Sequence, residues 1–177
     1  MKPIFLIGFP GCGKTTLGSA VNQATGMAFI DLDEAVEAQV GKSVTRIFAE
    51  DGETEFRRLE GEVLAQLCRR NDVLIATGGG TPCTAALMDM MLASGTVVWL
   101  TASRERLLTR LKEGRSKRPH IAQATDDDIA RYIDTKLAER TPHYCRAHLR
   151  FDADRLDTVP EVAQTVESFV KTIVRRQ

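Results

Sequence analysis

Short apolar runs alternate with longer amphipathic stretches along the whole chain. The runs predict five buried strands, at residues 2–7, 27–32, 73–76, 96–100 and 148–152. The stretches between them predict helices at residues 16–23, 34–40, 43–48, 54–70, 84–92, 103–112 and 126–140. Strands that alternate with helices are typical of an α/β domain with a parallel sheet. We therefore expect residues 1–177 to form a single domain of this class.

Two further stretches complete the pattern. Residues 158–161, Thr-Val-Pro-Glu, have the form of a capping box with a proline at the first helical position. They predict a last helix, and its buried stripe is Val162, Val166, Phe169, Val170 and Ile173. Residues 114–125, in contrast, show no clear period and are rich in polar and basic side chains. This segment is expected to be irregular.

Composition narrows the class of protein. Apolar residues make up 43% and charged residues 27% of the chain, which is ordinary for a globular domain. No window approaches 18 consecutive apolar residues, and the apolar run after the N-terminus is too short for a signal peptide. The cysteines are widely spread and predict reduced thiols rather than disulfides or a zinc site: Cys12, Cys68, Cys83 and Cys145. We expect a cytoplasmic protein that does not bind membranes.

Charge is balanced over the whole chain but unevenly distributed. Residues 1–100 hold 8 basic and 12 acidic side chains, whereas residues 101–177 hold 16 and 12. Residues 104–118 alone carry seven basic and two acidic side chains. This cluster is either a solvated helix face or a local positive field for an anionic ligand. The neutral total argues against a general nucleic-acid-binding protein.

Residues 8–15, Gly-Phe-Pro-Gly-Cys-Gly-Lys-Thr, match the phosphate-binding motif G-x-x-x-x-G-K-[ST] in full. A predicted strand precedes the motif and a predicted helix follows it, as the motif requires. Glycines let the backbone wrap closely around phosphate, and N–H groups at a helix N-terminus point at its oxygens. Lys14 can reach the β- and γ-phosphates, and the Thr15 hydroxyl can bind magnesium. The sequence therefore predicts a protein that binds a nucleoside triphosphate.

Other features exclude several classes of nucleotide-binding protein. A GTPase switch needs a D-x-x-G motif and a guanine-reading N-K-x-D motif, and the chain has neither. A motor or transporter ATPase is normally larger and ends an apolar strand in an acidic residue. Here the strand at residues 73–76 ends instead in Thr77 and three glycines. The class that remains is a small kinase that phosphorylates a small acceptor.

The acceptor side of such a kinase has several candidate residues. Asp31 and Asp33 end the second predicted strand, and carboxylates one residue apart on a strand point to opposite faces. One can face a metal beside Thr15, and the other can orient or deprotonate an acceptor hydroxyl. The triplet at residues 78–80 can bring backbone N–H groups close to a ligand. Three arginines suit the recognition of a carboxylate: Arg57, Arg118 and Arg140.

Taken in order, these residues resemble the shikimate kinase family. The resemblance covers about residues 4–170. Beyond the phosphate loop it rests on Asp31-Leu32-Asp33, residues 43–48 (Ser-Val-Thr-Arg-Ile-Phe), Gly52-Glu53, Phe56-Arg57 with Glu60, Gly78-Gly79-Gly80, Arg118-Pro119 and residues 140–144 (Arg-Thr-Pro-His-Tyr). The phosphate loop alone is generic, whereas the ordered set of the other motifs is specific.

The resemblance implies a fold and an activity. The fold is that of a P-loop NTPase of the nucleoside-monophosphate-kinase type, three-layer α/β/α with a five-stranded parallel sheet and a mobile lid at about residues 113–125. The activity is transfer of the ATP γ-phosphate to the 3-hydroxyl of shikimate, in the pathway to the aromatic amino acids. Mg²⁺ is the implied cofactor, ATP and shikimate are the implied partners, and we expect a monomer.

The resemblance also implies roles for the matching residues. The catalytic residues are Lys14, Asp33 as the base, and Arg118 on the lid. ATP is bound by Gly11, Cys12, Gly13, Lys14, Thr15, Thr16, Arg110, Arg118 and Arg155. Shikimate is bound by Asp33, Arg57, Gly79, Gly80 and Arg140, with the arginines Arg57 and Arg140 on its carboxylate. Magnesium is bound by Thr15 directly and by Asp31 through water.

Three features depart from the family pattern. His120 stands where an apolar leucine is usual, Thr81-Pro82 follows the glycine triplet, and Cys12 replaces the common serine or alanine. Because Cys12 lies near a helix N-terminus, we expect bound ATP to shield its thiol from alkylation. Two alternative functions stay open: a kinase for another acceptor such as gluconate, and a nucleotide-binding module without turnover. The arginine pair argues against the first alternative, and Asp33 argues against the second.

Overall fold

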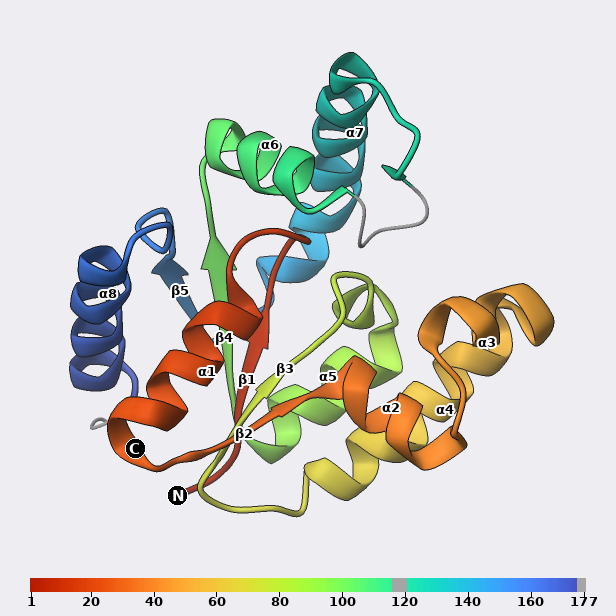
Figure 1. Ribbon diagram of the computed structural model, residues 1–177. Coiled ribbons are helices and arrows are strands. Elements are labelled where there is room, and N and C mark those ends of the chain that lie inside the picture. Colours follow the sequence, from red (N-terminus) through yellow and green to blue (C-terminus); the bar gives the residue numbers. More distant parts are fainter. Residues whose placement is uncertain (116–120, 175–177) are drawn as a thin grey trace.

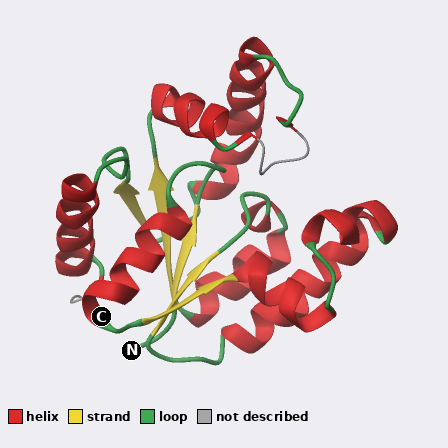
Figure 2. Cartoon of the chain, in the orientation of Figure 1, coloured by secondary structure: helices red, strands yellow, loops and turns green. Residues whose placement is uncertain are grey.

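Five parallel strands form the centre of the fold. The structure, a computed structural model, describes residues 1–115 and 121–174. In sequence order the strands are β1 (Ile4–Ile7), β2 (Ala28–Asp31), β3 (Val73–Ala76), β4 (Thr96–Thr101) and β5 (Leu149–Asp152). They lie in the order β2-β3-β1-β4-β5, and every neighbouring pair is parallel (Figure 2). The predicted five-stranded parallel sheet is confirmed.

Helices lie on both faces of this sheet (Figure 1). They are α1 (Lys14–Thr25), α2 (Leu32–Val40), α3 (Val44–Glu50), α4 (Gly52–Leu67), α5 (Ala85–Ser94), α6 (Arg104–Glu113), α7 (Asp126–Tyr144) and α8 (Val159–Thr172), with a short 3₁₀ helix, η1 (Thr81–Cys83). Helices α1 and α8 pack side by side, α2 and α3 pack on α4, and α6 packs on α7. The arrangement is the predicted three-layer α/β/α architecture.

The strand order decides where a ligand can bind. Strand β1 is central, with β3 on one side and β4 on the other. After β1, the chain forms β2 and β3 on one side of that strand. It then crosses to the other side and forms β4 and β5. In open parallel sheets, ligands bind at the carboxyl ends of the strands beside such a switch. The end of β1, where residues 8–15 begin, lies at this point.

Strands β1 and β3 consist of unbroken apolar runs because they lie in the hydrophobic core. All four residues of each strand are buried. Strands covered by helices on both faces have no solvent side, so apolar and polar residues do not alternate along them. Strand β5 is an edge strand, and two of its four residues are polar and exposed.

Several helices begin at a residue whose side chain accepts a hydrogen bond from a backbone amide of the first turn. Thr158 accepts a hydrogen bond from the Glu161 amide, and the Glu161 carboxylate accepts one from the Thr158 amide. The predicted capping box is therefore confirmed. Ser43 caps α3 and Ser103 caps α6 through the same kind of side-chain bond.

Several predicted element ends differ from the structure, and two of these differences bear on the site. Strand β2 ends at Asp31, whose carboxylate accepts from the Asp33 amide at 3.1 Å and so begins α2 at Leu32. Asp33 therefore lies in the first turn of a helix, and strand alternation does not describe the two carboxylates. Helix α7 runs four residues beyond Arg140 and includes Pro142. Its last turn is held by the fully buried Tyr144, an interaction that local pattern does not reveal.

We predict that Gly95→Ala lowers the free energy of unfolding by about 1–3 kcal/mol. A Cβ at Gly95 would lie 2.1 Å from the Pro3 carbonyl oxygen, a backbone atom that cannot rotate away. Gly61→Ala in α4 is the matched control, because its Cβ would meet only the end of the Leu87 side chain at 3.2 Å. Urea unfolding of the two variants measures the difference. Equal effects on both would contradict the steric explanation.

Candidate active site

The phosphate loop connects β1 to α1 with the backbone conformation that its glycines allow. Gly8, Gly11 and Gly13 have φ values of 143°, 86° and 99°. These values are strained for residues that carry a Cβ. Helix α1 begins directly after Gly13, at Lys14. The N-terminus of α1 therefore lies at the loop, in the arrangement that binds phosphate oxygens through backbone N–H groups.

Lys14 is held by the loop itself. Its Nζ donates to the carbonyl oxygens of Gly8 and Phe9, at 2.8 and 3.2 Å. These bonds keep the ammonium group beside the place where a phosphate would enter. Cys12, within the same loop, has only 1% of its surface exposed. Because the protein itself buries this residue, the structure removes the reason to expect ATP to shield its thiol from alkylation.

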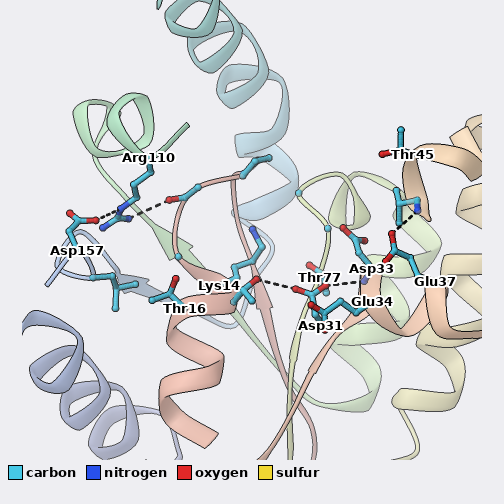
Figure 3. A pocket seen from close by; sticks show the side chains of 18 residues that line it. Lys14, Thr16, Asp31, Asp33, Glu34, Glu37, Thr45, Thr77, Arg110 and Asp157 are labelled. Carbon is cyan, nitrogen blue, oxygen red and sulfur yellow. Dashed lines mark hydrogen bonds and ion pairs between the residues drawn. The ribbon is translucent and has the colours of Figure 1, made fainter. Parts of the chain in front are cut away.

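A cleft of about 710 Å³ opens above the phosphate loop (Figure 3). Arg110 and Asp157 lie at one end, and Asp33, Glu37 and Thr45 lie at the other. The predicted residues that line it are Gly11, Gly13, Lys14, Thr15, Thr16, Asp31, Asp33, Gly79 and Arg110. The cleft is long enough to bring a donor side and an acceptor side to one surface.

Thr15 and Asp31 meet on the floor of the cleft. The Thr15 hydroxyl donates to Asp31 Oδ2 at 3.0 Å, and Asp31 Oδ1 accepts from the Asp33 amide. Both groups offer oxygen, the ligand that Mg²⁺ prefers. Among the described residues there is no group of three or more His, Cys, Asp or Glu that could hold a metal ion. The donor set therefore fits a cation bound mostly by phosphates and water, as Mg²⁺ usually is at nucleotide sites.

Asp33 is the most strongly perturbed acid in the cleft. Its pKa is raised from 3.8 to about 6, mainly by burial and then by the negative charges of Asp31 and Glu60, against the opposing effect of Lys14 and Arg57. Among the described residues, Asp33 Oδ1 is the one buried side-chain oxygen or nitrogen without a hydrogen-bond partner. A buried carboxylate oxygen with no donor is an acceptor for a ligand's hydroxyl.

The glycine triplet after β3 lies against three acceptor-side groups. A Cβ at Gly78 would lie 3.1 Å from Asp33 Oδ1, and a Cβ at Gly79 would lie 3.1 Å from Arg140 Nη1. A Cβ at Gly80 would lie 2.5 Å from Arg57 Nη2. Each glycine thus leaves room for a different polar side chain. Sequence reasoning selected Gly79 and Gly80 but gave Gly78 no role.

Buried partners fix both predicted carboxylate-binding arginines. Arg57 Nη1 donates to Glu60 Oε2 at 2.7 Å, and Glu60 is fully buried. The Arg140 guanidinium lies 5.7 Å from the centre of the Phe9 ring. The arginines share a pocket of about 330 Å³ with Gly80, next to the main cleft.

Glu60 and Tyr144 belong to the motifs that resemble the family, and the sequence assigned them no role, but both contact predicted site residues. The Tyr144 hydroxyl donates to the Gly79 carbonyl at 2.6 Å, and burial raises the Tyr144 pKa, so that the phenol stays a donor. Glu60 follows Arg57 by three residues on α4, a spacing that indicates an ion pair on a helix. That spacing was the available signal for Glu60, whereas the Tyr144 contact spans 65 residues and had none.

Comparison with known proteins identifies the family of this chain. Residues 10–173 match the family model described as Shikimate kinase. A shikimate kinase from Parabacteroides distasonis is 39% identical over 98% of this chain and 100% of its own length. One from Chlorobium limicola is 37% identical over 97% of this chain and 86% of its own length. The chain belongs to the shikimate kinase family.

Solved shikimate kinases agree with this assignment. One from Bacteroides thetaiotaomicron has 35% identity and a TM-score of 0.93, with 98% of each chain covered. One from Acinetobacter baumannii, solved in complex with shikimate, has 28% identity and a TM-score of 0.84, over 100% of this chain and 95% of that one. The predicted fold class and activity are confirmed: the chain is an ATP-dependent kinase that phosphorylates the 3-hydroxyl of shikimate.

The two arginines predicted to bind ATP, Arg110 and Arg155, have different surroundings. Arg110 lines the cleft and donates to Asp157 at 2.7 Å, to the Asp154 carbonyl at 2.7 Å and to the Gly11 carbonyl at 3.4 Å. It therefore ties the phosphate loop to the turn after β5. The Arg155 side chain is 65% exposed and lines a separate depression with residues of α8, so the structure does not bring it into the cleft.

The basic cluster at residues 104–118 is largely neutralised within the described part of the chain. Arg104 pairs with Asp134, whereas Arg106 and Arg110 both pair with Asp157. Lys112 and Arg115 both pair with Asp126, the first residue of α7. These partners lie 11 to 51 residues away in sequence, so the run of positive charge overstated the local field. Arg118 and His120, with residues 116–120 of the predicted lid, lie outside the described residues.

We predict that Asp33→Asn stabilises the folded enzyme at neutral pH. The pKa of Asp33 is about 6 in the folded state, against an ordinary value of 3.8. The folded state therefore loses stability as the pH rises through this interval. Because asparagine mimics the neutral acid, the variant should gain up to about 3 kcal/mol at pH 7.5. Urea unfolding at pH 7.5 and pH 4 measures the gain. A gain of the same size at both pH values would show that ionisation of Asp33 is not its cause.

Proposed function

We propose that the cleft performs in-line phosphoryl transfer, with the phosphate loop as the donor side and the start of α2 as the acceptor side. The observation that carries this assignment is Asp33, a buried carboxylate with a raised pKa and one oxygen without a donor. A binding module has no need of such a group, because a buried charge without a partner costs folding stability.

On the donor side, the loop amides and the N-terminus of α1 bind the phosphates of ATP. Lys14 exchanges its bonds to the Gly8 and Phe9 carbonyls for the β- and γ-phosphates and stabilises charge as the γ-phosphoryl group moves. Thr15 and Asp31 would hold Mg²⁺, directly and through water respectively, and are already 3.0 Å apart. The cation supplies charge neutralisation on the phosphates when it is bound.

On the acceptor side, Asp33 receives the proton of the 3-hydroxyl. The oxygen forms a bond to the γ-phosphorus while the bond between that phosphorus and the β,γ-bridging oxygen breaks and ADP leaves. A pKa of about 6 keeps Asp33 ionised at pH 7 yet basic enough to accept the proton. Arg57 and Arg140 bind the carboxylate of shikimate, and Gly79 and Gly80 let the ring approach the backbone.

We further propose that the enzyme works in the cytoplasm as a monomer of one kinase domain, without nucleic acid. The four free cysteines suit a reducing compartment. No helix among the described residues has the length and apolar character needed to cross a membrane. The donor and acceptor residues named above all belong to one chain, so the proposed site needs no second copy.

The acceptor and the metal can be tested in one assay of ADP release from ATP. We expect turnover with shikimate and none with gluconate or without acceptor. EDTA should abolish the turnover, and added Mg²⁺ should restore it. Turnover with gluconate alone would overturn the roles of Arg57 and Arg140, and turnover unaffected by EDTA would overturn the roles of Thr15 and Asp31.

We predict that kcat/KM for shikimate rises with pH below a value of about 6 and is level above it, because the ionised Asp33 is the base. Asp33→Asn should lower kcat by about 100- to 10,000-fold while ATP affinity stays within about twofold. Steady-state kinetics between pH 5 and 8, with ATP binding by calorimetry, measure both. Loss of ATP binding together with turnover would mean that Asp33 acts on the donor side.

A further inference from the structure

Thr81 stands directly after the glycine triplet and is fully buried. It is the first residue of η1, and its hydroxyl donates a hydrogen bond to Glu60 Oε1. The other oxygen of the same carboxylate, Oε2, accepts from Arg57 Nη1 at 2.7 Å. One buried carboxylate is therefore shared between a hydroxyl and a guanidinium group.

The two bonds depend on each other through the plane of the Glu60 carboxylate. A buried carboxylate is stable only when hydrogen-bond donors satisfy its oxygens. With Thr81 on one oxygen, rotation of the group is restricted and the second oxygen is directed at Arg57. The other ion-pair partner of Arg57 is Glu53, at 3.4 Å and with a side chain 69% exposed, which constrains the guanidinium far less.

We propose that Thr81 is a positioning residue for shikimate recognition, and that its hydroxyl sets the orientation of Arg57 through Glu60. The proposal rests on the proposed role of Arg57 in binding the shikimate carboxylate. It gives a function to the threonine that departs from the family pattern after the triplet. Specificity for a planar carboxylate requires a guanidinium fork held in one orientation. Thr81 contributes to that orientation without touching the substrate.

A purely structural role for Thr81 makes a different prediction. Its backbone amide donates to the Gly78 carbonyl and its carbonyl accepts from the Thr84 amide, so the residue also belongs to the turn. If the turn alone mattered, loss of the hydroxyl would lower stability or affect ATP and shikimate alike. The separation of the two KM values therefore distinguishes a positioning role from a structural one.

The test compares Thr81→Val, which keeps the shape but removes the hydroxyl, with Thr81→Ser, which keeps the hydroxyl. We expect the valine variant to raise KM for shikimate about tenfold, which is the change that the loss of one hydrogen bond would produce. KM for ATP and kcat should stay within about twofold, and the serine variant should restore KM for shikimate. Thr165→Val is the matched control, because it removes a buried hydroxyl that donates to the Arg155 carbonyl on α8's side of the molecule.

The remaining outcomes separate this inference from the proposed function. An unchanged KM for shikimate in Thr81→Val, or equal damage in the valine and serine variants, overturns the role of Thr81. If Thr81→Val does not fold, Thr81→Ala carries the same comparison with Thr81→Ser. Arg57→Gln tests the premise: if it leaves KM for shikimate unchanged, the proposed role of Arg57 fails first. If Arg57→Gln raises that KM and Thr81→Val does not, the inference about Thr81 alone fails.

Discussion

The close approach of one backbone turn to three polar side chains is the constraint on which the acceptor side depends. The turn at residues 78–80 follows β3 at the centre of the molecule, and each of its glycines faces a different group: Asp33, Arg140 and Arg57. Side chains on this turn would push those groups apart. The absence of three Cβ atoms therefore lets the proposed base and the two arginines approach the same turn. Tyr144 holds the same turn from α7 through the Gly79 carbonyl.

Around this turn, several acidic side chains lie close together, and their mutual repulsion lowers the stability of the folded state. Asp33 is buried beside two other acids, Asp31 and Glu60, with Lys14 and Arg57 as partial compensation. Burial and, after it, these like charges disfavour the ionised form of Asp33 and give it a pKa suited to accept a proton near neutral pH. The same arrangement makes the folded state less stable than it would be with a neutral residue. The loss of stability and the proposed catalytic role of Asp33 thus have the same physical cause.

The donor side is held differently, by contacts that span the chain. Arg110 joins the phosphate loop to the turn after β5, and Asp157 in that turn accepts from both Arg110 and Arg106. These bonds connect one end of the cleft to the loop that follows the central strand β1. The described basic residues of the cluster at residues 104–118 are therefore paired with acidic side chains and do not form a free positive field. Arg110 and Asp157 among these pairs line one end of the cleft.

The sequence by itself determined the sheet, the phosphate loop and most helix starts, because these depend on local patterns such as apolar periodicity, glycine conformation and capping side chains. The ordered motifs were enough to place the chain in its family. Tertiary structure decided the rest: Asp31 begins α2 instead of extending a strand, Tyr144 extends α7 past Pro142, and Glu60 links Arg57 to Thr81. It also decided that Arg155 lies away from the cleft and that the basic cluster is paired. Most of these outcomes depend on partners that are far apart in sequence, such as Thr81 and Glu60 at 21 residues or Tyr144 and Gly79 at 65, and local pattern does not show which of these residues meet.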